Sequence, residues 1–188
     1  MINYPKFAQV NGKKYKINTD YRIALECEKI SKSDISEEER ALAILYLLFG
    51  NEGLDNSEDW NELLQIGLKY LNCGKELKQN DTEEANVDFR QDWSYIQASF
   101  FSDYNLDLSN IEMHWWQFYD LLCGLTEKCI LNRVRFVRDF DISQIKDSNE
   151  KEKWIKQKQQ VELKKERIKT SEEKRLDDLF EQQLKRGV

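Results

Sequence analysis

The chain has a single histidine, His114, and it begins the aromatic run His114–Phe118. An imidazole acts as a catalytic base or a metal ligand only when other residues supply a nucleophile, an orienting acid or further ligands. No residues at a spacing typical of such a constellation accompany His114. The sequence therefore predicts a histidine in the core or at a helix edge, and not a catalytic one.

Four cysteines, Cys27, Cys73, Cys123 and Cys129, are scattered through apolar helical patterns without any Cys-x-x-Cys pair. A zinc site needs several thiolate or imidazole ligands brought together. Cys123 and Cys129 are six residues apart, which does not place them on one face of a helix. The pattern predicts buried, reduced thiols and no metal site.

Carboxylates are plentiful, as in Glu37-Glu38-Glu39, Glu83-Glu84 and Asp139-Phe140-Asp141. Acid–base catalysis needs a pair of them in a shielded cleft with separated pKa values. These acids instead fall in loops and at helix starts, where they complement the helix dipole. A Gly-rich phosphate loop is also missing from the sequence. We therefore expect a non-enzymatic protein with no catalytic, cofactor-binding or metal-binding residues.

Composition narrows the class of protein further. The 188 residues include 34% charged residues but only 7 Gly and 1 Pro, a balance that favours helices in a single domain. The net charge of -6 disfavours nucleic acid as a partner, although basic residues from Arg133 to Lys169 could form a local positive patch. No apolar run is long enough to cross a bilayer, and no secretory pattern follows Met1. We expect a cytosolic protein without a membrane partner.

The elements that position these residues begin with a hairpin. Residues 7–10 and 13–17 flank Asn11-Gly12, the dipeptide that best fits a type I′ turn. Asp20 is then placed to cap a helix, and Ser36 with Glu39 forms a capping box for the next one. The sequence therefore predicts a small N-terminal hairpin followed by at least two helices.

Further helices are predicted by polar residues that precede apolar stretches. Ser57 is predicted to open the next helix, and the predicted caps after it are Asp92, Ser109 with Glu112 as a second capping box, and Thr126. The helix after Ser57 is predicted to bury the stripe Trp60, Leu63, Leu64, Leu68 and Leu71. Residues 73–88 are polar and predict a surface loop. The segment from Ile111 to Leu125 is so apolar that its helix should be nearly central.

A charged arm follows the helical domain. After Gln144, lysine, glutamate and glutamine dominate and apolar residues become sparse, so we divide the chain into a domain at 1–144 and a helical C-terminal arm at 145–188. The remaining apolar residues of the arm recur at helical spacing but form a stripe too narrow for a long coiled coil. This stripe is predicted to dock on a partner or on the surface of the domain itself. The predicted partner-binding residues are Trp154, Val161, Ile168, Leu176, Leu179 and Leu184. The predicted fold is mainly α, a compact helical domain with an N-terminal β-hairpin and this arm.

Several motifs together resemble a known family. They are Thr19-Asp20-Tyr21-Arg22, Asp88-Phe89-Arg90-Gln91-Asp92, Ile96 with Phe100, Tyr104-Asn105-Leu106-Asp107-Leu108, His114-Trp115-Trp116-Gln117-Phe118 and Leu121-Leu122-Cys123-Gly124-Leu125. In this order, after an N-terminal hairpin, they resemble the bacteriophage Gp-fifteen family of small tail-region proteins. The resemblance covers nearly the whole chain, and it is weakest in the lysine-rich end.

The resemblance implies a protein encoded beside the tape-measure gene of long-tailed phages and acting in the host cytoplasm. Tail assembly chaperones of this kind shield the long, helical tape-measure protein, whose exposed apolar stripes would otherwise associate nonspecifically. The expected partner is thus the tape-measure protein, with self-association or a second tail assembly protein as further possibilities. The alternative is a structural tail component that is retained in the virion. Neither role requires a cofactor.

Overall fold

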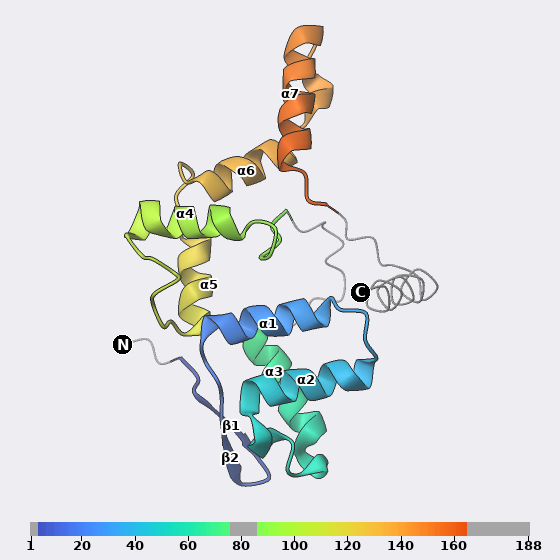
Figure 1. Cartoon of the computed structure of the whole chain (residues 1–188), viewed down its shortest axis with the longest axis vertical. Coiled ribbons are helices and arrows are strands. Elements are labelled where there is room, and N and C mark those ends of the chain that lie inside the picture. Colours follow the sequence, from blue (N-terminus) through green and yellow to red (C-terminus); the bar gives the residue numbers. More distant parts are fainter. Residues whose placement is uncertain (1–3, 76–85, 165–188) are drawn as a thin grey trace, which may run out of the picture.

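The computed structural model describes residues 4–75 and 86–164, and these form a mainly helical protein with one two-stranded hairpin, as predicted (Figure 1). The elements in chain order are β1 (Phe7–Val10), β2 (Lys13–Lys16), α1 (Tyr21–Ser31), α2 (Glu37–Phe49), α3 (Trp60–Leu71), α4 (Trp93–Tyr104), α5 (Trp115–Cys123), α6 (Ile130–Asp139) and α7 (Ser148–Val161). Single 3-10 turns lie at Asn51–Gly53, Ser57–Asp59 and Ile142–Gln144.

The hairpin forms as its turn residues predict. Asn11 and Gly12 have φ angles of 49° and 77°, and β1 pairs antiparallel with β2 so that Ala8 faces Tyr15. The buried carboxylate of Asp59 accepts hydrogen bonds from the Tyr15 hydroxyl at 2.5 Å and from the Asn11 amide at 2.7 Å. This carboxylate therefore joins the hairpin to the start of α3.

The first two helix starts also follow from the sequence. The Asp20 carboxylate accepts from the Arg22 backbone N–H at 2.9 Å, and it begins α1. At the start of α2, Ser36 accepts from the Glu39 backbone N–H while the Glu39 carboxylate accepts from the Ser36 backbone N–H. Both predicted caps are confirmed.

The buried face of α3 includes most of the predicted stripe, since Leu63 is buried and Trp60, Leu64 and Leu71 pack against the core, but it does not include Leu68. Leu63, Gly67 and Tyr70 are buried, whereas Leu68 is 37% exposed. A Cβ atom at Gly67 would lie only 2.9 Å from Cδ1 of the buried Leu48 on α2. The side of α3 that carries Gly67 therefore packs against α2, because only a glycine leaves room for Leu48. A prediction based on large apolar residues does not include this glycine.

Aromatic rings form the centre of the molecule, where α1, α5 and α4 meet. Tyr21 stacks on Phe118 with ring centroids 4.8 Å apart, and Phe118 stacks on Phe100 at 5.1 Å. The Tyr21 hydroxyl donates to the Leu108 carbonyl at 2.6 Å, so this buried polar atom is satisfied. The predicted central position of the aromatic helix is confirmed, because Phe118 is fully buried.

Two other predicted helix starts are wrong. Residues 111–114 do not form the first turn of α5, because the Met113 carbonyl accepts from Tyr21 N–H and the Thr19 carbonyl accepts from Trp115 N–H. Ser109 and Glu112 therefore form no capping box, and α5 begins at Trp115.

Thr126 is likewise not a helix cap. Its N–H and hydroxyl both donate to the carboxylate of Asp103, which ties it to α4. The cap of α6 is instead Cys129, whose thiol accepts from the Asn132 N–H at 3.4 Å.

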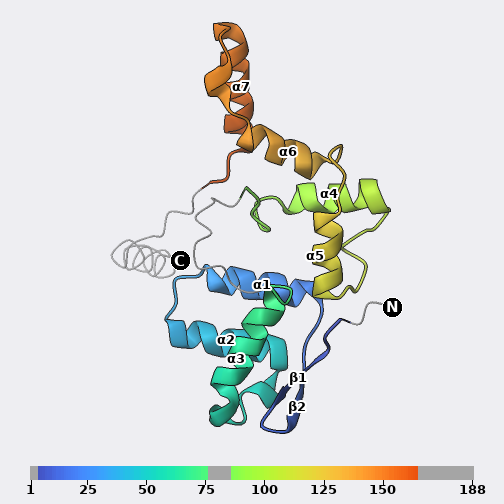
Figure 2. The same cartoon turned by 180° about the vertical axis from the view of Figure 1, so that it is seen from behind.

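The last two helices form a projection. Figures 1 and 2 show α6 beside α4, with α7 continuing beyond the body at one end of the molecule. The predicted boundary between residues 144 and 145 falls between the 3-10 turn Ile142–Gln144 and α7. No residue of α7 is buried. The predicted helical arm is thus a 14-residue helix up to Val161, and residues 165–188 lie outside the described part of the chain.

Candidate partner-binding site

His114, the first candidate for chemistry, is the cap of α5. Its Nδ1 accepts from the Trp116 backbone N–H at 3.0 Å, and Nε2 lies 3.0 Å from the Pro5 carbonyl oxygen. Since Nδ1 is an acceptor, Nε2 carries the proton and donates a hydrogen bond to the Pro5 carbonyl oxygen. The ring is therefore neutral. Burial lowers the pKa of His114 below its usual value. The helix-edge position matches the sequence prediction, and both ring nitrogens have structural partners.

The cysteines only partly match the prediction of buried thiols. Cys27 and Cys129 are buried, but Cys73 is half-buried and Cys123 is exposed; all four are free. Burial raises the pKa of the Cys27 and Cys73 thiols to about 12. Within residues 4–75 and 86–164, no three His, Cys, Asp or Glu side chains are placed to hold a metal ion.

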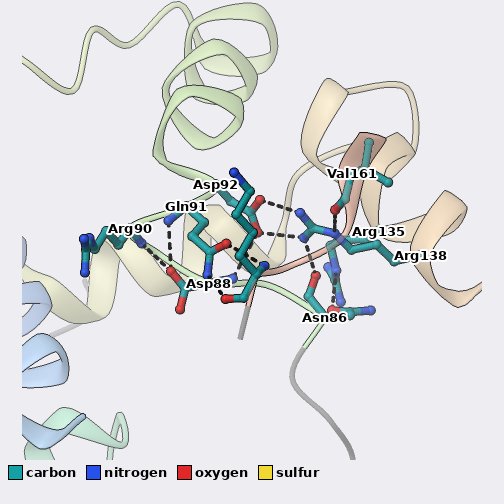
Figure 3. A network of polar contacts seen from close by, with 9 residues as sticks. Asn86, Asp88, Arg90, Gln91, Asp92, Arg135, Arg138 and Val161 are labelled. Atoms are coloured by element: carbon teal, nitrogen blue, oxygen red, sulfur yellow. Dashed lines mark hydrogen bonds and ion pairs between the residues drawn. The ribbon is translucent and has the colours of Figure 1, made fainter. Parts of the chain in front are cut away.

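A buried ion pair connects α4 to α6. Nη1 and Nη2 of Arg138 each donate to one oxygen of the Asp92 carboxylate at 2.7 Å (Figure 3). The Arg138 side chain is 10% exposed and that of Asp92 1%. Asp92 was predicted to be the cap of α4, but its side chain accepts no capping bond from that helix. Asp92 does precede the first residue of α4 as predicted, but its carboxylate binds the guanidinium and the Asp88 N–H instead of the first turn of the helix.

The same guanidinium gathers two further chain segments. Arg138 donates through Nη1 to the Asn86 carbonyl at 2.8 Å and through Nε to the Val161 carbonyl at 2.6 Å. Next to it, the Gln91 amide donates to the Lys164 carbonyl at 3.0 Å and accepts from the Lys164 N–H at 2.8 Å. The chain after α7 is thus directed back to the start of α4.

Aromatic stacking attaches α7 to α6. The rings of Phe140 and Trp154 are nearly parallel, with centroids 3.9 Å apart, and Phe136 lies 6.4 Å from Trp154 in an edge-on arrangement. Lys158 Nζ donates to the Phe140 carbonyl at 2.6 Å. We call residues 130–164 the α6–α7 unit, and Phe136, Phe140 and Trp154 its aromatic edge.

The predicted partner-binding residues of the arm fall into two groups. Trp154 and Val161 are half-buried, and the Trp154 ring stacks on Phe140 while the Val161 backbone carbonyl accepts from Arg138. The other four, Ile168, Leu176, Leu179 and Leu184, lie outside the described residues. Of the six predicted residues, Trp154 is therefore the one that lies in the aromatic edge.

Phe136 is the aromatic residue that sequence analysis missed. Its ring is 60% exposed although it touches both Phe140 and Trp154. The sequence does contain a sign of this exposure. Phe136 does not share the helix face of Ile130, Val134 and Val137, so its large apolar ring has no expected place in the core. Arg138 was considered only as part of a local positive patch, whereas its guanidinium is nearly buried.

Comparison with known proteins identifies the family. A family model described as Bacteriophage Gp15 protein matches residues 3–163. The chain belongs to the Bacteriophage Gp15 protein family. No curated protein and no solved structure matches the chain.

Membership in the Gp15 family confirms the resemblance derived from the motifs. It makes this a bacteriophage protein and indicates a structural or assembly role. The match includes the contacts of Arg138 with Asp92, Asn86 and Val161, which we call the Arg138 junction. It also includes the aromatic edge but ends just before Lys164. Among the described residues, no helix is both long and apolar enough to span a membrane.

Proposed function

We propose that this Gp15 protein is a non-enzymatic tail assembly chaperone that shields the tape-measure protein in the host cytoplasm during tail morphogenesis. Family membership supports a role in phage structure or assembly. The observation that carries the finer assignment is the α6–α7 unit, in which α7 projects from the body without any buried residue and Phe136 of α6 is exposed.

A chaperone for a long helical client needs apolar surface that is accessible yet held in place. Helical partners are recognised through anchors at helical spacing and need no reactive group. The aromatic edge supplies such anchors, while the Arg138 junction fixes α6 against α4. The engaged nitrogens of His114 agree with a non-enzymatic role.

Co-expression with fragments of the tape-measure protein tests the proposal. The expected result is a soluble complex that copurifies, whereas fragments expressed alone are insoluble. Fragments that stay insoluble and do not copurify would contradict the chaperone role.

Mass spectrometry of purified virions separates this role from the structural alternative. A chaperone is expected to be absent from the virion or present in trace amounts. Stoichiometric amounts would identify a structural tail component instead.

A further inference from the structure

We propose that the aromatic edge of the α6–α7 unit binds an acidic amphipathic helix, that is, a helix whose apolar stripe is flanked by carboxylates. This inference rests on the proposed function, because it names the surface and the chemistry by which a helical client is held. Both the exposed ring of Phe136, beside the half-buried rings of Phe140 and Trp154, and the charge of the surrounding helices support it.

Charge is distributed unevenly along this acidic chain. Residues 130–164 contain nine Lys and Arg but six Asp and Glu, a net charge of +3. Residues 86–129 contain two basic and seven acidic residues, a net charge of -5. The α6–α7 unit is therefore a basic projection on an acidic protein, and its field favours an anionic partner.

The acids of this unit are largely engaged in local structure. Asp141 accepts from Ser143, Asp147 accepts from the Glu150 N–H at the start of α7, and Asp139 accepts from Asn86. Glu152 pairs with Lys156. Four of the six carboxylates thus already have partners in the described structure.

Most basic residues of this unit lack an acidic partner, although Arg135 donates to the side-chain oxygens of Asn86 and Asn132 and Lys158 donates to the Phe140 carbonyl. Within the described structure, only Arg138 and Lys156 of this unit have a carboxylate at ion-pair distance. The seven without one are Arg133, Arg135, Lys146, Lys151, Lys153, Lys158 and Lys164. Arg133 is exposed and lies three residues before Phe136, so the two side chains are neighbours on the surface of α6. A carboxylate beside an apolar anchor would meet this guanidinium.

Exposed aromatic rings beside basic groups are also found in proteins that bind single-stranded nucleic acid. The interspersed carboxylates and the overall charge of -6 oppose a polyphosphate more strongly than a peptide helix. An acidic helix needs only a few favourable pairs around an apolar contact, and we therefore assign the surface to a protein helix.

The experiment measures fluorescence anisotropy of two labelled helical peptides with the full chain. The peptides share one leucine stripe, and their flanking positions are all Glu in one and all Lys in the other. We expect the Glu peptide to bind at least about tenfold more tightly than the Lys peptide, with an affinity that decreases as salt is added.

Phe101 offers a matched control for Phe136. Both rings are 60% exposed, but Phe101 lies on α4 outside the aromatic edge. We expect Phe136→Asp to weaken binding of the Glu peptide about tenfold or more, and Phe101→Asp to leave it unchanged. Arg133→Glu should abolish the preference between the peptides. Circular dichroism verifies folding, and Phe136→Ser replaces the aspartate variant if that one does not fold.

The outcomes separate this inference from the proposed function. Equal binding of both peptides, or equal loss in the Phe101 and Phe136 variants, would overturn the inference. So would a labelled oligothymidylate that binds more tightly than the Glu peptide, or a dimer that Phe136→Asp dissociates. A tape-measure fragment that copurifies equally with wild type and Phe136→Asp would support the chaperone role. It would also exclude the aromatic edge as the surface that binds the client.

Discussion

Asp92 and Arg138 form a two-pronged ion pair between the start of α4 and the end of α6, with both N–O distances at 2.7 Å. The carboxylate is almost completely buried, and it also accepts the Asp88 N–H at 3.0 Å. Since the same guanidinium holds the carbonyls of Asn86 and Val161, one side chain joins four segments of the chain.

Removing one partner of this pair should be costly. Arg138→Met leaves the Asp92 carboxylate buried without a counter-charge, and we expect unfolding free energy to decrease by about 3–5 kcal/mol. Urea denaturation followed by circular dichroism measures this loss. In the double variant with Asp92→Asn, the loss should be smaller than the sum of the two single losses.

The exposed pair Glu152–Lys156 provides the control, since its side chains are 63% and 67% exposed. Glu152→Gln should change unfolding free energy by no more than about 0.5 kcal/mol. Comparable losses at the two pairs would show that burial does not set the strength of the Asp92–Arg138 interaction.

Asp92 also illustrates what can be predicted from the sequence. The caps at Asp20 and Ser36 are correct because each depends on a backbone N–H within three residues. Asp92 has the same local pattern, but a guanidinium 46 residues away occupies its carboxylate. Local spacing cannot distinguish these two cases.

In the candidate site, too, local features are predictable from the sequence and contacts between distant residues are not. The helical character of α7 and the presence of Trp154 among its apolar residues follow from composition and spacing. The stacking of Trp154 on Phe140 depends on the turn at Ile142–Gln144 between α6 and α7. No sequence motif predicts this turn. The exposure of Phe136 becomes evident only when the neighbours of α6 are known.

The buried face of α3 gives a second prediction. Leu63 is fully buried, so Leu63→Ala should lower unfolding free energy by about 2–5 kcal/mol. Leu68, on the same helix, is 37% exposed, and Leu68→Ala should cost less than about 1 kcal/mol. Urea denaturation of both variants tests the orientation of α3, and losses of equal size would contradict it.

The thiols should differ strongly in reactivity. Cys123 is exposed, whereas burial raises the pKa of Cys27 and Cys73 to about 12 and so keeps both thiols protonated at pH 8. Because the thiolate is the reactive form, iodoacetamide should modify Cys123 roughly a hundredfold faster than Cys27 or Cys73. Peptide mass spectrometry after timed quenching measures the rates. The order should disappear in urea, and its persistence there would exclude burial as the cause.

His114 should make the folded state sensitive to mild acid. In the unfolded chain a histidine protonates near pH 6.5, but burial lowers the pKa of His114 in the fold. The unfolded chain therefore binds more protons below about pH 6.5, so the contribution of His114 is complete above that pH and is lost as the pH falls. Protonation would also remove the Nδ1 acceptor from the Trp116 N–H.

His114→Asn isolates this effect, since asparagine can cap a helix without titrating near neutral pH. The variant should be less stable than wild type at pH 7.5, because it loses the stacking of the imidazole on Tyr4. Its urea midpoint should then decrease less between pH 7.5 and pH 5.5 than the wild-type midpoint, since carboxylates contribute equally to both proteins. Parallel pH profiles would mean that His114 is not the titrating group, and a steeper profile in the variant would reverse the sign of its pKa shift.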